Sequence, residues 1–224
     1  MSDKETRTIE LPEYTRGEEI MNMVSHIVGG AIGIAVTVFG VLFSAWRKDP
    51  WGVVGAAIYG FTMIWLYTMS SIYHGLRPGR AKKVMRVLDH CTIYALIAGT
   101  YTPILLAGVR PIYPVTAWVC FGIEWGLLAL TTTLTAVNLK KYGKFSMICY
   151  IAMGWLVVFI APKVIDVMGS CGFLWLLFGG IAYSIGAVLY GVGKKKRWFH
   201  SIFHFFVLLG SLLQAVAILF YILK

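Results

Sequence analysis

Charged residues are scarce in this chain of 224 residues, and that scarcity excludes most soluble protein classes. Only 13% of the residues are charged and ten are acidic, whereas soluble domains carry about 25% charged residues. Hydrophobic residues make up 58% of the sequence, and the mean hydropathy is +0.75. The composition therefore predicts an integral membrane protein.

Cysteine is also scarce, with four residues and no Cys-x-x-Cys pair. Cys91, Cys120 and Cys149 fall within apolar segments, and Cys171 lies near the outer end of the sixth. We expect reduced thiols, because nothing pairs these residues and a thiolate zinc site needs closely spaced cysteines.

Seven apolar segments are long enough to cross the roughly 30 Å core of a bilayer. Because only helices satisfy their backbone groups within one segment there, we expect an all-α bundle of seven transmembrane helices. Residues 1–20 are polar and acidic and are expected to form a short N-terminal tail or interfacial helix; no signal peptide is expected before the first span. Residues 21–224 form the membrane domain, with spans at about 22–46, 51–74, 84–107, 112–135, 145–162, 173–193 and 199–222.

The net charge of +10 is distributed unevenly across the predicted membrane. If the N-terminus is cytoplasmic, fifteen of the 20 Lys and Arg residues lie on that side. The positive-inside rule then predicts a cytoplasmic N-terminus and an outer C-terminus. The basic loops are interpreted as topology determinants and contacts to anionic lipids, not as a nucleic-acid surface. The fifteen are Lys4, Arg7, Arg16, Arg77, Arg80, Lys82, Lys83, Arg86, Lys140, Lys141, Lys144 and 194–197.

Ionisable residues within the spans gather at one depth. The second span ends at His74, and the third begins shortly before Asp89. His200 and His204 lie in the first two turns of the seventh span, so all four residues lie near the predicted cytoplasmic face. Intramembrane ionisable groups are costly and are functional candidates. Two histidines four residues apart share a helix face and can chelate one metal ion, and His74 would make the three-ligand set typical of catalytic zinc.

Each of these groups also has a structural interpretation. A lone membrane histidine is usually a hydrogen-bonded structural group, Ser70 can bond its own helix backbone, and Asp89 can pair with Arg86. His26 and His90 lie at the same depth, but His90 follows Asp89 and should point about 100° away from it. His26, with Asn22 and Ser25, could support the ligands, whereas Glu124 lies mid-span and has no assigned role.

Four segments resemble the motifs of one membrane protein family: GEEIMNMVSHIVGG (17–30), SSIYHGLRPG (70–79), LDHCTIYALIAGTYTP (88–103) and WFHSIFHFFVLLGS (198–211). Their order and spans are similar to those of the hemolysin III family, bacterial relatives of the progestin and adiponectin receptors in a superfamily that includes alkaline ceramidases. The resemblance runs from about Gly17 to the C-terminus and implies seven helices with the N-terminus inside.

The resemblance also implies roles for individual residues. The three histidines that hold zinc in the receptors correspond to His74, His200 and His204. The family aspartate that holds or activates water at the zinc corresponds to Asp89, and the serine one turn before the first histidine corresponds to Ser70.

We therefore expect a Zn²⁺-dependent hydrolase in the inner (plasma) membrane that acts on a lipid amide or ester in membrane lipid homeostasis. Its partners would be membrane lipids, and its metal site would lie near the cytoplasmic face. The alternatives are a non-enzymatic lipid-state regulator or receptor with structural zinc, and a pore-forming cytolysin, as the family's name implies.

Overall fold

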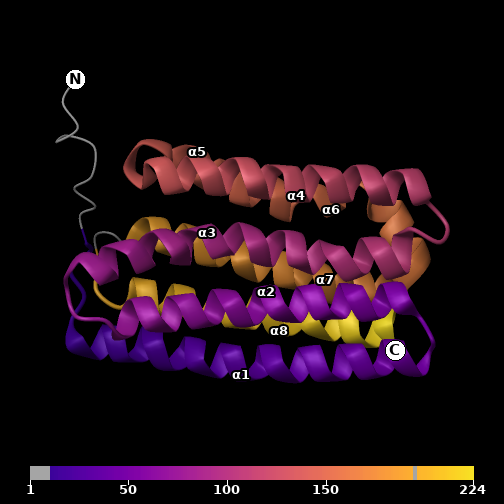
Figure 1. The fold of residues 1–224 in the computed structure, drawn as a ribbon, viewed down its shortest axis with the longest axis horizontal. Helices are drawn as coiled ribbons and strands as arrows, with labels where there is room; N and C mark the ends of the chain where they lie inside the picture. The colour runs from indigo at the N-terminus through magenta and orange to yellow at the C-terminus, as the bar shows by residue number, and fades with distance from the viewer. Residues whose placement is uncertain (1–10, 194–195) are drawn as a thin grey trace.

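The computed structural model describes residues 11–193 and 196–224, and all regular structure in these ranges is helical (Figure 1). Within them, seven helical segments are long and apolar enough to cross a membrane, which confirms the predicted fold class. Residues 1–10 of the expected tail, with Lys4 and Arg7, lie outside the described residues, as do Lys194 and Lys195 of the basic loop. The segments are Arg16–Trp46, Pro50–Gly75, Arg80–Val109, Pro114–Val137, Leu139–Phe159, Ala161–Gly191 and Phe199–Leu223.

The first helix, α1 (Arg16–Trp46), begins six residues earlier than the predicted span. Thr15 and Glu18 form a capping box at its start: the Thr15 hydroxyl accepts a hydrogen bond from the Glu18 N–H, and the Glu18 carboxylate accepts one from the Thr15 N–H. This reciprocal pair satisfies two backbone donors that would otherwise lack a partner. As a result, Glu18 and Glu19 belong to the first helix.

The other helices follow in antiparallel order, and their ends carry clear signals. Pro50 starts α2 (Pro50–Gly75) after the capping residue Asp49, and Pro114 starts α4 (Pro114–Val137). Proline suits the first helical position because no backbone donor is lost there. The remaining elements are α3 (Arg80–Pro103), η1 (Ile104–Val109), α5 (Leu139–Gly154), α6 (Leu156–Phe159), α7 (Ala161–Gly193), α8 (Phe199–Ile218) and η2 (Leu219–Leu223).

The third span occupies the centre of the bundle. In its most apolar window 78% of the residues are buried, against 22% for the fourth and for the fifth span. In Figure 1, α1, α2 and α8 lie together along one side, α3 and α7 lie in the middle, and α4 and α5 form the opposite edge. The central span therefore separates two groups of helices.

Four spans depart from a regular α-helix: α7 is kinked at Gly169, where φ is 70°, α8 continues into η2, and the third and fifth spans are interrupted. α3 contains Pro103, and the chain continues from there into the π-helical turn η1. The fifth span breaks between α5 and α6 at Trp155, where the Tyr101 hydroxyl accepts a hydrogen bond from the Val157 N–H at 2.8 Å and donates one to the Gly154 carbonyl at 3.1 Å. One side chain thus satisfies two backbone groups that the break leaves without helical partners.

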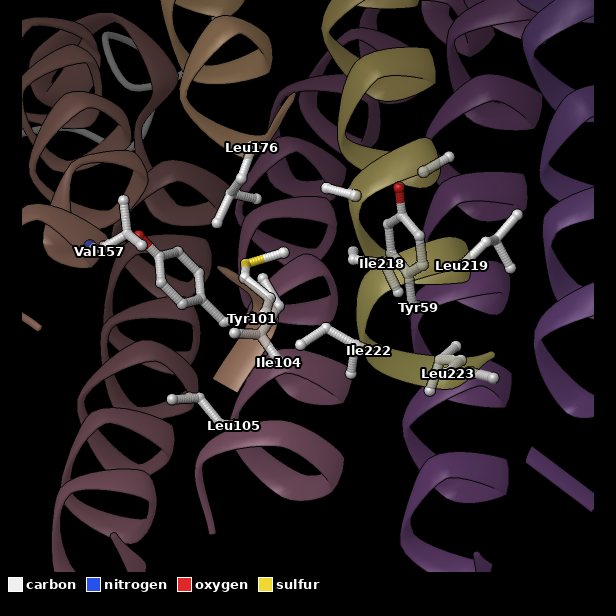
Figure 2. Packing of buried hydrophobic residues seen from close by; sticks show 14 of the residues in the cluster. Tyr59, Tyr101, Ile104, Leu105, Val157, Leu176, Ile218, Leu219, Ile222 and Leu223 are labelled. Carbon is white, nitrogen blue, oxygen red and sulfur yellow. Dashed lines mark hydrogen bonds between the residues drawn. The ribbon is translucent and has the colours of Figure 1, made fainter. Parts of the chain in front are cut away.

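Buried hydrophobic residues fill the bundle along much of its length (Figure 2). In this view Ile218, Leu219, Ile222 and Leu223 of α8 and η2 lie near Tyr59 of α2. On the other side of the view, Tyr101 lies beside Val157. All four cysteines are free, with Cys171 exposed and the other three buried.

Close contact between α2 and α3 depends on the absence of a side chain at Gly99. A Cβ atom there would lie 2.0 Å from Thr62 Oγ1 and 2.9 Å from Thr62 Cβ. On the lipid-facing side of α4, by contrast, a Cβ atom at Gly126 would meet nothing within 4 Å. The backbones of α2 and α3 therefore approach each other closely at Gly99. These two helices bear several of the candidate site residues.

Candidate metal site and adjoining cavity

The candidate site forms where α2 ends and where α1, α3 and α8 begin. Antiparallel connections bring these four helix ends to the same end of the bundle. His74 lies in the last turn of α2, Asp89 lies on α3, and His200 and His204 lie in the first turns of α8. The structure thus gives these residues the shared depth that the sequence predicts, whereas the side of the membrane on which they lie stays a prediction.

His74, His200 and His204 form a compact cluster. One nitrogen from each ring lies within 4.8 Å of the other two. His200 Nε2 and His204 Nε2 are 3.1 Å apart, and the His74 ring centroid lies 5.3 Å and 4.9 Å from those of His200 and His204. His74 and His204 are buried, and His200 is partly buried. Three histidines distant in sequence therefore meet at one point.

The donor set fits a zinc ion. Two nitrogens on a tetrahedral zinc with 2.0–2.1 Å bonds lie about 3.3 Å apart, close to the 3.1 Å between the two α8 histidines. His74 Nε2 is buried and has no hydrogen-bond partner among the described residues. Buried polar atoms without partners are costly, and a cation would satisfy a ring nitrogen of this kind. The metal's identity is a matter for the proposal below.

Ser70 and Asp89 lie beside the cluster. With His200 and His204, they line a cavity inside the bundle. Ser70 is one turn before His74 on α2 and lies near Asp89 of α3. Asp89 Oδ2 also lies 3.5 Å from His90 Nδ1. The Asp89 side chain keeps 17% of its surface exposed, so its carboxylate is available to a molecule in the cavity.

The other two histidines differ from each other. The His90 ring bonds the Arg86 carbonyl through Nδ1 at 2.8 Å and the Tyr190 hydroxyl through Nε2 at 3.2 Å, so both nitrogens have partners. The expectation that His90 points away from Asp89 was therefore only partly right, since its ring also reaches the Asp89 carboxylate. His26 stacks on His204 with ring centroids 3.8 Å apart. Neither histidine belongs to the cluster of three.

Glu124 lies apart from the site, as its mid-span position indicates. Its side chain on α4 is fully buried, and neither carboxylate oxygen has a hydrogen-bond partner among the described residues. Cys120, one turn earlier, and Tyr101 of α3 are its electrostatic neighbours.

Glu19 and Tyr14 contact the cluster directly and Lys82 contacts Glu19, and none of the three was predicted to lie there. Glu19 Oε2 lies 2.6 Å from His74 Nδ1, and Glu19 Oε1 lies 2.6 Å from Lys82 Nζ. The Tyr14 ring stacks on His200 with a centroid distance of 4.8 Å. Lys82 is buried, which corrects the expectation that it contacts anionic lipids with the other basic loop residues. The capping pattern Thr15-x-x-Glu18 was the sequence signal that could have placed these acidic residues on the first helix.

A cavity of about 180 Å³ extends from the cluster into the bundle. At the cluster end it is lined by His26, Ser70, Asp89, His200 and His204. Its walls then follow α3 from Asp89 to Ile104, a helical rise of about 22 Å at 1.5 Å per residue. Beyond the cluster most lining residues are apolar, including Ile93, Leu96, Ile97, Met147, Ile151, Val157, Leu176, Leu177 and Val207. The polar cluster therefore lies at one end of a long apolar space.

Comparison with known proteins decides the family. Residues 14–215 match the model of the family described as "Haemolysin-III related". The chain belongs to this family. It is 34% identical over 211 residues to the "Hemolysin-3 homolog" of Bacillus subtilis, covering 94% of this chain and 97% of that protein.

Two further relatives extend the comparison. "Hemolysin-3" of Bacillus cereus is 34% identical over 224 residues, covering 100% of this chain and 98% of that protein. The human "Monocyte to macrophage differentiation factor" is 27% identical over 184 residues, covering 79% and 74%. No solved structure gives a significant match. The family membership confirms the resemblance of the four sequence segments and, with the seven helical spans, identifies a multi-pass membrane protein, while the three clustered histidines form a group that could hold a metal ion.

Proposed function

We propose that this haemolysin-III-related protein is a zinc-dependent hydrolase of a lipid amide or ester. The observation that carries the proposal is that two histidines of the cluster, His200 and His204, line one end of a long apolar cavity beside Ser70 and Asp89. A cavity lined mostly by apolar groups with a few polar groups at one end suits a molecule with a polar head and an acyl chain. The cleavable bond would then lie near Asp89 and Ser70.

His74, His200 and His204 would hold the ion through ring nitrogens, and three protein ligands leave a coordination position open for chemistry. When bound, zinc supplies Lewis-acid polarisation of a carbonyl group and makes water acidic enough to attack near neutral pH. The protein's own contribution is a dry cavity and a fixed set of proton-carrying groups.

Asp89 is the residue we assign to proton transfer. Its carboxylate would take a proton from the attacking water and deliver it to the leaving amine or alkoxide. Ser70 would orient this carboxylate, since its side chain lies near Asp89 in the cavity lining. Tyr190 of α7 lies at the same end of the cavity, with its ring 5.7 Å from that of His200, and its hydroxyl bonds the neighbouring His90.

The site would lie on the cytoplasmic side of the inner membrane, because most Lys and Arg residues lie at this end of the spans. The exposed cations near this end, Arg77, Arg80, Lys196 and Arg197, would favour lipids with anionic head groups. This extends the substrate class to acyl lipids of the inner leaflet and the role to membrane lipid homeostasis.

The test is hydrolysis of defined amide and ester lipids by the protein purified in detergent. We expect turnover that is lost with a zinc chelator, restored by zinc, and abolished in Asp89→Asn. Asp166→Asn is the matched control, because Asp166 is exposed in the first turns of α7 and bonds Tyr113 outside the candidate site. Turnover that survives both the chelator and Asp89→Asn would refute the hydrolase.

Two other functions give different results in the same preparation. A lipid-state regulator with structural zinc would bind zinc and lose thermal stability in His204→Ala, yet turn over no lipid. A cytolysin would release dye from liposomes. The buried position of α3 in the middle of the bundle does not favour a central pore, so we rank lysis last.

A further inference from the structure

Two adjacent carboxylates in the first turn of α1 contact two different helices that carry the clustered histidines. Glu19 contacts His74, in the last turn of α2. Glu18 Oε1 accepts a hydrogen bond of 2.6 Å from the backbone N–H of Trp198, the residue that precedes α8. α8 carries His200 and His204. A single turn of α1 therefore contacts both the end of α2, which carries His74, and the start of α8, which carries the other two histidines.

The contact from Glu19 determines which nitrogen of His74 is free. A carboxylate can only accept a hydrogen bond, so the 2.6 Å contact requires a hydrogen on His74 Nδ1. In the neutral ring the lone pair then lies on Nε2, which is buried without a partner among the described residues. The Asn22 amide nitrogen is 3.5 Å from Nδ1, a much longer contact. Carboxylates that hold the second ring nitrogen of a metal-binding histidine fix its tautomer and orientation.

Glu19 is itself held in place from the other side. Its Oε1 bonds Lys82 Nζ at 2.6 Å, and Lys82 Nζ also donates to the Leu76 carbonyl at 2.9 Å. Leu76 is the residue after α2, and Lys82 belongs to the first turn of α3. The chain Lys82–Glu19–His74 therefore locks the end of α2 against α1 and α3.

The contact from Glu18 determines where α8 begins. Trp198 has a left-handed backbone with φ of 67°, and it provides no side-chain cap to the helix. Its N–H bonds the carboxylate of Glu18, whose other oxygen is held by Thr15. A negative charge at a helix N-terminus is favourable because of the helix dipole. The bond fixes the backbone two residues before His200.

We infer that Glu18 and Glu19 are positioning residues that act together to set the distance between His74 and the two histidines of α8. Glu19 orients the His74 ring, and Glu18 fixes the start of α8 relative to the same turn of α1. The inference rests on the proposed binding of a metal ion by the three histidines. It assigns a function to acidic residues that contact no substrate.

The experiment measures zinc content and zinc affinity, by competition with a chromogenic chelator, in protein purified in detergent. We expect Glu19→Ala to weaken zinc affinity by about 10- to 100-fold, the range found when a partner of a ligand histidine is removed. Glu19→Gln should lose less, because the amide oxygen can still accept from His74 Nδ1. Glu18→Gln should also bind zinc more weakly than wild type. Glu13→Gln is the matched control, since Glu13 is exposed and close in sequence.

A second readout separates positioning from general destabilisation. The absorption bands of Co²⁺ bound in place of zinc should shift in Glu19→Ala and Glu19→Gln and stay unchanged in Glu13→Gln. Affinity within twofold of wild type in Glu19→Ala, with unchanged Co²⁺ bands, would overturn the inference. If Glu19→Ala does not fold, Glu19→Gln provides the test. Zinc affinity and Co²⁺ bands equal to those of Glu13→Gln would overturn the inference, and shifted Co²⁺ bands would support it. Wild-type protein without zinc affinity would instead refute the metal site itself.

Discussion

Replacing Gly99 by Ala should destabilise the bundle at the contact between α2 and α3. The added Cβ would lie 2.0 Å from Thr62 Oγ1, 2.9 Å from Thr62 Cβ and 3.0 Å from Thr62 Cγ2. Rotating the Thr62 side chain moves Oγ1 and Cγ2 but leaves Cβ in place, because the backbone fixes that atom. The two helices must therefore move apart, or the backbone must shift.

The size of the effect follows from this geometry. Ordinary contact begins at about 3.4 Å, so the 2.0 Å approach to Oγ1 is too short by about 1.4 Å. Overpacking of a well-packed interior costs about 1–3 kcal/mol. For a chain of this length each kcal/mol lowers Tm by about 2–4 °C, so we expect Gly99→Ala to lower Tm by roughly 2–12 °C.

The assay is thermal unfolding of purified protein in detergent, with Gly126→Ala as the control. Gly126 lies on an exposed face of α4, where a Cβ atom meets nothing within 4 Å. Alanine is favoured over glycine in helices by about 1 kcal/mol, so this variant should not lower Tm.

A second substitution tests the cause. Thr62→Ala removes the two atoms at 2.0 Å and 3.0 Å but keeps the Cβ at 2.9 Å, so it should rescue part of the loss in Gly99→Ala. The double-mutant cycle should give a favourable coupling of about 0.5–3 kcal/mol. A wild-type Tm for Gly99→Ala would refute this reasoning. An equal loss of Tm from Gly99→Ala in the wild-type and Thr62→Ala backgrounds would also refute it, because the added methyl group would then not clash with Thr62.

Three further variants test other parts of the structure. Tyr101→Phe should cost about 1–3 kcal/mol, measured as a lower Tm, because it leaves the Gly154 carbonyl and the Val157 N–H buried without their partner; an unchanged Tm would contradict this role. Adding zinc at a hundredfold excess over its Kd should stabilise metal-stripped wild type by about 2.7 kcal/mol, and the same concentration should have little effect on Tm in His74→Ala. Glu124→Gln should leave Tm nearly unchanged, since a neutral amide of similar size replaces a buried carboxyl group that has no hydrogen-bond partner among the described residues; a clear drop would indicate a partner for this carboxyl group.

The sequence predicted the seven spans and the common depth of the candidate residues because both depend on segment length and direction. An apolar run of about 20 residues spans a bilayer regardless of its neighbours. The direction of each span then gives the depth of His74, Asp89, His200 and His204 without knowledge of packing. These are the parts of the structure that local composition determines.

The contacts of individual side chains depend on helix rotation and close packing, which depth does not give. Lys82 was expected among the basic loop residues that contact anionic lipids, but the carboxylate of Glu19 and the Leu76 carbonyl provide partners that allow it to be buried. Glu19 was assigned to a polar tail because its charge suggested solvent. Its partners lie 55 and 63 residues farther along the chain.

The irregular segments were missed for a different reason. The break at Trp155 falls inside a continuous apolar run, so neither length nor hydropathy reveals it. Its stability depends on Tyr101 of another helix. Pro103 did signal a disturbance of the third span, but the π-helical turn after it depends on the surrounding packing.

The bond between Glu18 and Trp198 has a consequence for the order of biosynthesis. It joins residues 180 positions apart, so the first helix to leave the ribosome carries a carboxylate whose partner is made with the last helix. His74 likewise meets His200 and His204 only when the final span has been inserted. A truncated or incompletely inserted chain cannot assemble the cluster, and occupancy of the site by a metal would therefore report that membrane insertion of the whole protein is complete.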